Sequence, residues 1–177
     1  MDQPELSNLL TRLIENWESE VVEFKRADNS FSSGDLGKYL SAIANEANLR
    51  EIARGWLVFG IDNKLRSVVG SSYKLNPEHL QADKSIVLNG TGGFTFRNIY
   101  VLNHSSGRVV LFEIPAAPRG MPIAWNGHYY GRAHESLFAL GQDKLDEIRG
   151  QTLATDWTAQ LVVGAREGKQ QRWNSSR

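Results

Sequence analysis

The chain contains no cysteine, which excludes a disulfide framework and any zinc site built on thiolates. It also lacks an apolar run that approaches the roughly 20 residues of a membrane-spanning helix, and no secretory leader opens it. No Walker A sequence is present, so we expect no ATP site. Together these absences favour a soluble protein of a reducing compartment with no membrane partner, and we expect it in the cytoplasm.

The net charge is zero, with 20 basic and 20 acidic residues, which weighs against a strongly basic nucleic-acid arm. The charges are unevenly spread, because acidic residues crowd the first 23 positions while arginines recur through the later predicted strands. A local basic patch is therefore still compatible with the composition. The length suits one domain. We expect it over residues 1–155, followed by a truncated helix and a mobile polar tail over 156–177.

Apolar residues recur at helical spacing in several segments, the clearest being Leu6 to Ile14. In the segment over residues 77–88, the side chains of Leu80, Ile86 and Val87 are expected to point towards the core. The predicted helices cover residues 6–17, 36–47, 77–88 and 143–149, and a fifth begins at 156–163.

The predicted strands are shorter and rich in β-branched and aromatic residues. They cover residues 17–25, 55–62, 65–70, 94–102, 109–114 and 128–132. Gly90 to Gly93 lacks the Lys-Ser/Thr ending of a phosphate-binding loop, so we interpret it as a turn. The pattern predicts an α+β fold with a single mixed, mainly antiparallel sheet, packed by the helix over 36–47.

The stretch from Trp17 to Lys25 organises this prediction. In a strand, Val22 and Phe24 point to one face, while Glu23 and Lys25 point to the other. One face is then apolar and the other charged. Such a carboxylate and lysine can hold a metal or meet a phosphate, and they can equally neutralise each other. Glu18 lies just before the strand and could reach the same rim.

Asp62 is the first charge after the apolar run over 55–62, and turn-like Asn63-Lys64 follows it. Functional sites of open mixed sheets often form at such strand ends. Asp62 is therefore a candidate site residue, with the capping of a turn as the alternative.

Four groups of residues together resemble the Schlafen AlbA_2 domain. They are Glu18 and Glu23 with Phe24-Lys25, Ala44-Asn45, Gly60-Ile61-Asp62-Asn63, and Tyr129-Tyr130-Gly131-Arg132. The resemblance covers roughly residues 15–150. It implies a Schlafen-like core that binds nucleic acid, since the family is described as a DNA-binding domain, and in bacterial relatives it usually opens a longer transcriptional regulator.

The same resemblance implies an alternative, because a related core in vertebrate Schlafen proteins is a metal-dependent endoribonuclease that cleaves transfer and ribosomal RNA. Its three carboxylates map onto Glu18, Glu23 and Asp62, which would hold Mg²⁺ or Mn²⁺, and Lys25 would stabilise developing charge. The chain departs from those proteins in lacking cysteines for their zinc site. It also has one copy of the core where they use two lobes, so clasping RNA would require a homodimer.

The predicted partner is nucleic acid, either DNA or structured RNA. The predicted phosphate contacts are Lys25, Arg26, Arg97, Arg119 and Arg132. Arg132 is expected to form a phosphate contact or a salt bridge rather than to act as a catalyst, because guanidinium keeps its proton. We place binding ahead of catalysis, and an interaction domain that does neither is a third hypothesis.

Overall fold

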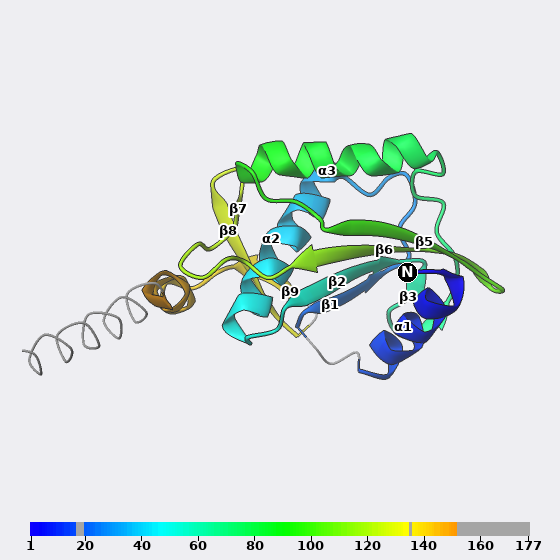
Figure 1. Cartoon of the computed structure of the whole chain (residues 1–177), viewed down its shortest axis with the longest axis horizontal. Helices are drawn as coiled ribbons and strands as arrows, with labels where there is room; N and C mark the ends of the chain where they lie inside the picture. Colours follow the sequence, from blue (N-terminus) through cyan, green and yellow to red (C-terminus); the bar gives the residue numbers. More distant parts are fainter. Residues whose placement is uncertain (17–19, 135, 152–177) are drawn as a thin grey trace, which may run out of the picture.

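The computed structural model describes residues 1–16, 20–134 and 136–151. Its main sheet has four strands in the order β1-β2-β6-β5 (Figure 1). Their bounds are Val22–Lys25 for β1, Arg54–Phe59 for β2, Gly107–Pro115 for β6 and Asn98–His104 for β5. β1 and β2 are parallel, whereas the other two pairings are antiparallel. The predicted α+β class with a mixed, mainly antiparallel sheet is confirmed.

Two small antiparallel sheets accompany the main one. The first pairs β3 (Ile61–Asp62) with β4 (Ser67–Val68), which is the predicted hairpin after the apolar run. The second contains β7 (Ala124–Trp125), β8 (His128–Ala133) and β9 (Ser136–Ala139). β8 packs against helix α2 rather than joining the main sheet.

Helix α2 (Ser33–Leu49) connects the two parallel strands, as parallel pairing requires a crossover. It begins after Ser32, whose Oγ accepts a hydrogen bond from the backbone N–H of Asp35 at 3.0 Å. Leu36 and Ile43 of this helix lie in a core cluster with Phe59 and other residues of the sheet. The helix therefore covers one face of the sheet, as predicted.

Helix α3 (Pro77–Thr91) covers the same face. It ends at Gly92, whose φ of 71° is a left-handed conformation that glycine adopts without strain. Gly90 and Thr91 belong to the helix, so the predicted turn over Gly90 to Gly93 is only partly correct. Leu80 and Val87 are buried as predicted, but Ile86 is 38% exposed, because the position before Val87 faces away from the core.

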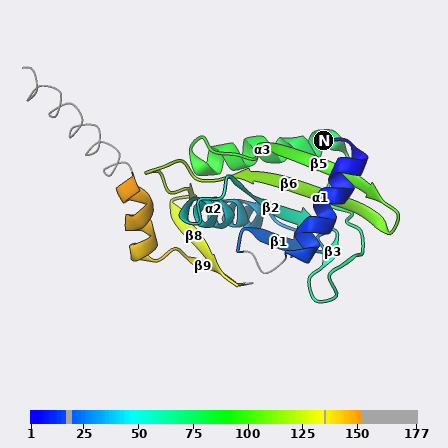
Figure 2. The same ribbon diagram turned by 60° about the horizontal axis from the view of Figure 1, so that its bottom comes forward.

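Helix α1 (Gln3–Glu15) covers the opposite face of the sheet (Figure 2). Asp2 and Glu5 form a capping box at its start. Leu6, Leu10 and Leu13 are the buried residues of its apolar face, and they share a core cluster with Phe24 of β1. The N-terminal helix is therefore one of the two layers that enclose the sheet.

Trp125 of β7 is buried between two helices, where it contacts glycines. A Cβ added at Gly37 of α2 or at Gly90 of α3 would overlap its indole ring. Trp56 is also buried, so both tryptophans pack in the core rather than form stacking platforms.

A last helix over residues 142–151 packs Leu145 and Ile148 against Leu49 of α2. Among the described helices, none is both long enough and apolar enough to cross a membrane. Trp17, Glu18 and the predicted fifth helix and tail lie outside the described residues. The proposed division of the chain after residue 155 stays a prediction.

Candidate nucleic-acid interface and buried charge network

Asp62 organises an exposed turn between β3 and β4. Its Oδ1 accepts hydrogen bonds from the backbone N–H groups of Lys64 at 2.9 Å and Leu65 at 2.8 Å. Its Oδ2 accepts two from the guanidinium of Arg26, with Nε at 2.9 Å. Asp62 therefore caps a turn, and through Arg26 it also ties that turn to the end of β1.

The Asp62 carboxylate is strongly stabilised in its charged form. The hydrogen bond from Leu65 and the bonds from Arg26 hold the pKa of Asp62 below its ordinary value. The Asp62 side chain is only 10% exposed, whereas that of Arg26 is 69% exposed. Arg26 consequently presents its charge to solvent even though it is paired.

Two more cations lie on this turn. Lys64 is exposed, and the guanidinium of Arg66 lies 5.8 Å from the ring centre of Phe24. We call Arg26, Lys64 and Arg66 the basic turn. Of these three, Arg26 and Lys64 are exposed, and Arg26 pairs with Asp62. The sequence signal was the turn-like Asn63-Lys64, but it did not identify Lys64 and Arg66 as part of a site.

Glu23 has a different environment from Asp62. It is 3% exposed and pairs with Arg132 of β8, which is 2% exposed. Arg132 also donates to the carbonyls of Glu20 at 2.8 Å, Val22 at 2.9 Å and His134 at 3.1 Å. Of the two predicted roles of Arg132, the structure shows the salt bridge. We therefore leave Arg132 out of the candidate interface.

Lys25 lies on the other side of Glu23, with 2.9 Å between its Nζ and Glu23 Oε1. This Nζ is also 5.0 Å from the ring centre of Tyr39. Burial by itself lowers the pKa of Lys25, but the interactions with Glu23 and Tyr39 outweigh it and the net pKa is raised. Lys25 therefore stays protonated at neutral pH, and Glu23 is held between two cations. The charged face predicted for β1 exists, but Glu23 on it is buried and Lys25 is only 33% exposed.

Sequence reasoning missed a second buried acid in this region, Glu46 of α2. Its Oε1 accepts from the backbone N–H of Arg132 at 3.2 Å and from Lys144 Nζ at 2.8 Å. We call Glu23, Lys25, Arg132, Glu46 and Lys144 the buried network. Its signal was the Asn45-Glu46 pair at the end of an otherwise apolar helix. Asn45 holds the loop before β7, because its side chain donates to the carbonyl of Ile123 and accepts from the backbone N–H of the same residue.

Glu23 and Asp62, two of the three predicted metal ligands, both contact basic side chains. Within residues 1–16, 20–134 and 136–151, no group of three or more acidic, histidine or cysteine side chains is placed to hold a metal ion. Both oxygens of Glu23 and both oxygens of Asp62 already contact nitrogen atoms. Glu18 is not described, so the three-carboxylate site stays a prediction.

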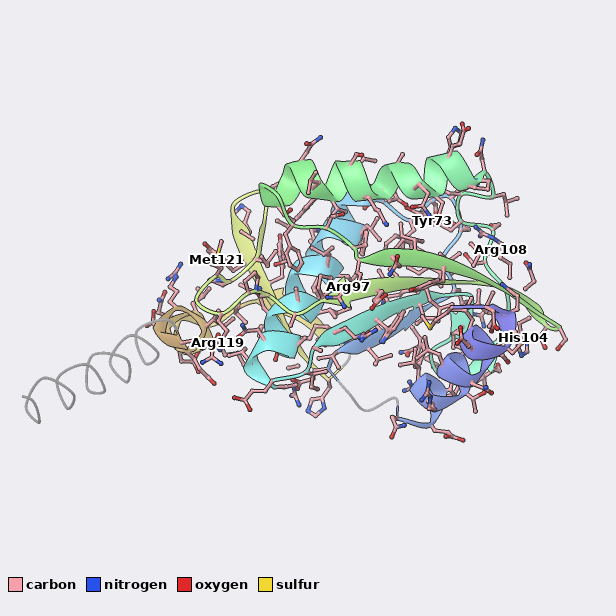
Figure 3. The ribbon with its side chains drawn as sticks, in the orientation of Figure 1. Tyr73, Arg97, His104, Arg108, Arg119 and Met121 are labelled. Carbon is pink, nitrogen blue, oxygen red and sulfur yellow. The ribbon has the colours of Figure 1, made fainter. Side chains whose placement is uncertain are left out.

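Arg97 and Arg119 are both exposed, but they do not join the basic turn. Figure 3 shows Arg119 towards the opposite end of the molecule from Tyr73 and Arg108, with Arg97 between them. Arg119 lies on the loop before β7, and Arg97 immediately precedes β5. The five predicted phosphate contacts therefore do not form one continuous surface.

Comparison with known proteins gives a consistent result. The Schlafen AlbA_2 family matches residues 18–140. Among solved structures, the DIP2311 protein of Corynebacterium diphtheriae has a TM-score of 0.55 at 13% identity, over 82% of this chain and 29% of that one. The N-terminal domain of a RecG-related protein of Nitrosomonas europaea has a TM-score of 0.49 at 20% identity. That match covers 76% of this chain and 90% of the Nitrosomonas domain.

The chain thus spans less than a third of the length of the Corynebacterium protein. No curated protein matches its sequence. The likeness to the Corynebacterium protein shows the fold. The family match over residues 18–140 covers more than half of the chain. This chain belongs to the Schlafen AlbA_2 family.

Proposed function

We propose that the protein binds nucleic acid through the basic turn. The observation that carries this proposal is that two exposed cations, Arg26 and Lys64, lie on segments joined by Asp62, beyond the carboxyl ends of β1 and β2. Ligands of open sheets containing parallel strands commonly bind at this end. Membership of the Schlafen AlbA_2 family supports the proposal, because the resemblance to that family implies nucleic-acid binding.

The exposure of the ion pairs supports this location over the buried network. In that network the Glu23 and Arg132 side chains are 3% and 2% exposed, and Lys25 and Lys144 are each 33% exposed. In the basic turn, by contrast, the Arg26 side chain is 69% exposed and Lys64 is exposed as well. Phosphate contacts of this kind position a nucleic acid without reading its sequence. We therefore expect affinity that depends strongly on salt and weakly on sequence.

The test is the affinity for labelled DNA and RNA oligonucleotides, measured by fluorescence anisotropy between about 50 mM and about 200 mM salt. The double variant Arg26→Gln with Lys64→Gln should reduce the slope of log affinity against log salt by about two, because each lost phosphate contact removes about 0.9. The matched control is Arg97→Gln with Arg119→Gln, which removes the same charge from exposed sites elsewhere.

The control double variant should change the slope by less than the turn variant. An equal or larger loss in the control would overturn the basic turn as the interface and favour the wider set of predicted arginines. Absence of binding by the unaltered protein at low salt would overturn nucleic-acid binding altogether and favour the interaction-domain hypothesis.

The metal-dependent endoribonuclease remains the alternative prediction, and so does the homodimer it would need. Asp62→Asn separates the two functions. Under the binding proposal, this substitution removes a negative charge from the basic turn and raises affinity, because Asn can still accept the turn hydrogen bonds. Under the nuclease hypothesis, cleavage of transfer RNA in Mn²⁺ is lost. Cleavage by the unaltered protein that Asp62→Asn abolishes would favour catalysis.

A further inference from the structure

A hollow of about 400 Å³ opens beside the basic turn. Its walls come from the segment over residues 26–31, which leads into α2, and from the segment over 69–72, which follows β4. Arg26 belongs both to the hollow and to the basic turn, so the two features are continuous. The volume lies within the range of small-ligand pockets.

Hydrogen bonds fix the relative position of the two segments that form the walls of the hollow. Ser71 Oγ donates to the carbonyl of Ala27 at 2.6 Å, and the N–H of Lys74 donates to Asn29 Oδ1 at 2.7 Å. Arg108 then fixes the second wall, because its Nη1 donates to the carbonyl of Tyr73 at 2.7 Å (Figure 3). The site is therefore preformed, and a ligand would not have to order these segments.

The lining combines apolar and polar groups. Phe31 is half-buried, with its ring centre 4.7 Å from that of Phe59, and it also lines the hollow. Val69 lines the hollow from the other segment and is 42% exposed. Ser30 and Ser72 add hydroxyl groups. A flat apolar ring with polar edges matches these walls, and a nucleobase is such a ring.

The charges in the hollow give a ligand an orientation. Hydrogen bonds from Ser30 hold the pKa of Asp28 below its ordinary value, so Asp28 is a carboxylate at neutral pH. A carboxylate accepts hydrogen bonds from the amino groups of bases and repels phosphate. Arg26, on the same hollow, attracts phosphate. The base edge would therefore lie towards Asp28 and the phosphate towards Arg26.

We propose that this hollow takes one unstacked nucleotide of a single-stranded nucleic acid, with the base between Phe31 and Val69 and its phosphate on Arg26. The inference rests on the proposed function and extends it from charge alone to a preference for single strands. A strand is favoured over a free nucleotide because the exposed Lys64 is linked to Arg26 through Asp62 and can bind a neighbouring phosphate.

The test compares binding of a short single-stranded oligonucleotide, the matching duplex and a free nucleoside monophosphate. Val69→Asp and Ser72→Phe change exposed side chains, so neither disturbs the core. Each should weaken single-strand binding about tenfold, the loss expected for one stacked base, and change duplex binding by less than about twofold. The matched control is Leu75→Asp, which adds the same charge at a 65% exposed residue outside the hollow lining.

Three outcomes would overturn the inference. In the first, Val69→Asp and Ser72→Phe weaken binding no more than Leu75→Asp does, while the basic-turn variant still lowers the salt slope; the hollow then has no role and the proposed function stands. In the second, the free monophosphate binds as tightly as the strand, which identifies a small-molecule site. In the third, no oligonucleotide binds at low salt, and the proposed function fails as well.

Discussion

The buried network begins on β1 and the basic turn begins at the residue after it, yet the arginines of their ion pairs differ in exposure. Glu23 and Arg132 are 3% and 2% exposed, and each makes several contacts inside the protein. Asp62 and Arg26 form a similar carboxylate and guanidinium pair, but the Arg26 side chain is 69% exposed. The position along the chain therefore says little about what a charged residue does.

The difference between the two regions lies in what covers them. Glu23 is 3% exposed and lies between Arg132 of β8 and Lys25, so its charge must be balanced inside the protein. No such cover lies over Arg26, so its pair is screened by water and contributes little to stability. Burial assigns the first pair to folding and leaves the second available for binding.

Among substitutions in the two regions, Arg132→Met should cause the largest loss in the free energy of unfolding. The substitution keeps an apolar stem of similar length but removes the cation between Glu23 and the backbone carbonyls of β1, so the free energy of unfolding should fall by about 3–5 kcal/mol. Urea unfolding measures it. Arg119→Met, at an exposed position, should change the same quantity by less than about 0.5 kcal/mol. Equal effects would mean that the buried pair has no structural role.

Glu23→Gln should have the next largest effect. Glutamine still accepts a hydrogen bond, but it no longer balances Arg132 and Lys25, and the loss should be about 1.5–3 kcal/mol in the free energy of unfolding. The matched control is Glu20→Gln, whose partner Arg50 is 44% exposed, so its loss should stay under about 1 kcal/mol.

The Glu23 result also bears on catalysis. Because Glu23 supports the fold, a loss of RNA cleavage in Glu23→Gln would not by itself assign a catalytic role to the carboxylate. If Glu23→Gln proved as stable as the unaltered protein while losing cleavage, the buried-network interpretation would be wrong and metal binding by Glu23 would gain support.

Much of the fold could be predicted because its signals are local. The apolar run over 55–62 and the helical spacing over 36–47 each identify an element without reference to the rest of the chain. Errors arose where a boundary depends on one residue. Gly60 has a φ of 100° and separates β2 from β3, and a Cβ there would lie 2.7 Å from the carbonyl oxygen of Arg108.

The candidate site was less predictable, because its pairs are distant in sequence. Glu23 and Arg132 are 109 residues apart, and their contact depends on how β8 packs across α2. Nothing near Arg132 in the sequence marks it as buried. Asp62, by contrast, was correctly expected at a turn, since Asn63-Lys64 follows it directly. That Arg26 is its partner depends on where β3 turns back towards the end of β1.

The smallest expected effect concerns the acid stability of the basic turn. The pKa of Asp62 is lowered in the folded protein from about 3.9 in the unfolded chain, so its carboxylate stabilises the fold fully above that value, and the contribution is lost as the pH falls through the lower folded pKa. The difference in unfolding free energy between the unaltered protein and Asp62→Asn should therefore be constant near neutral pH and shrink below about pH 4. Urea midpoints measured for both proteins across this range check it. A difference that persists unchanged at the lowest pH would show that the charge of Asp62 does not stabilise the turn.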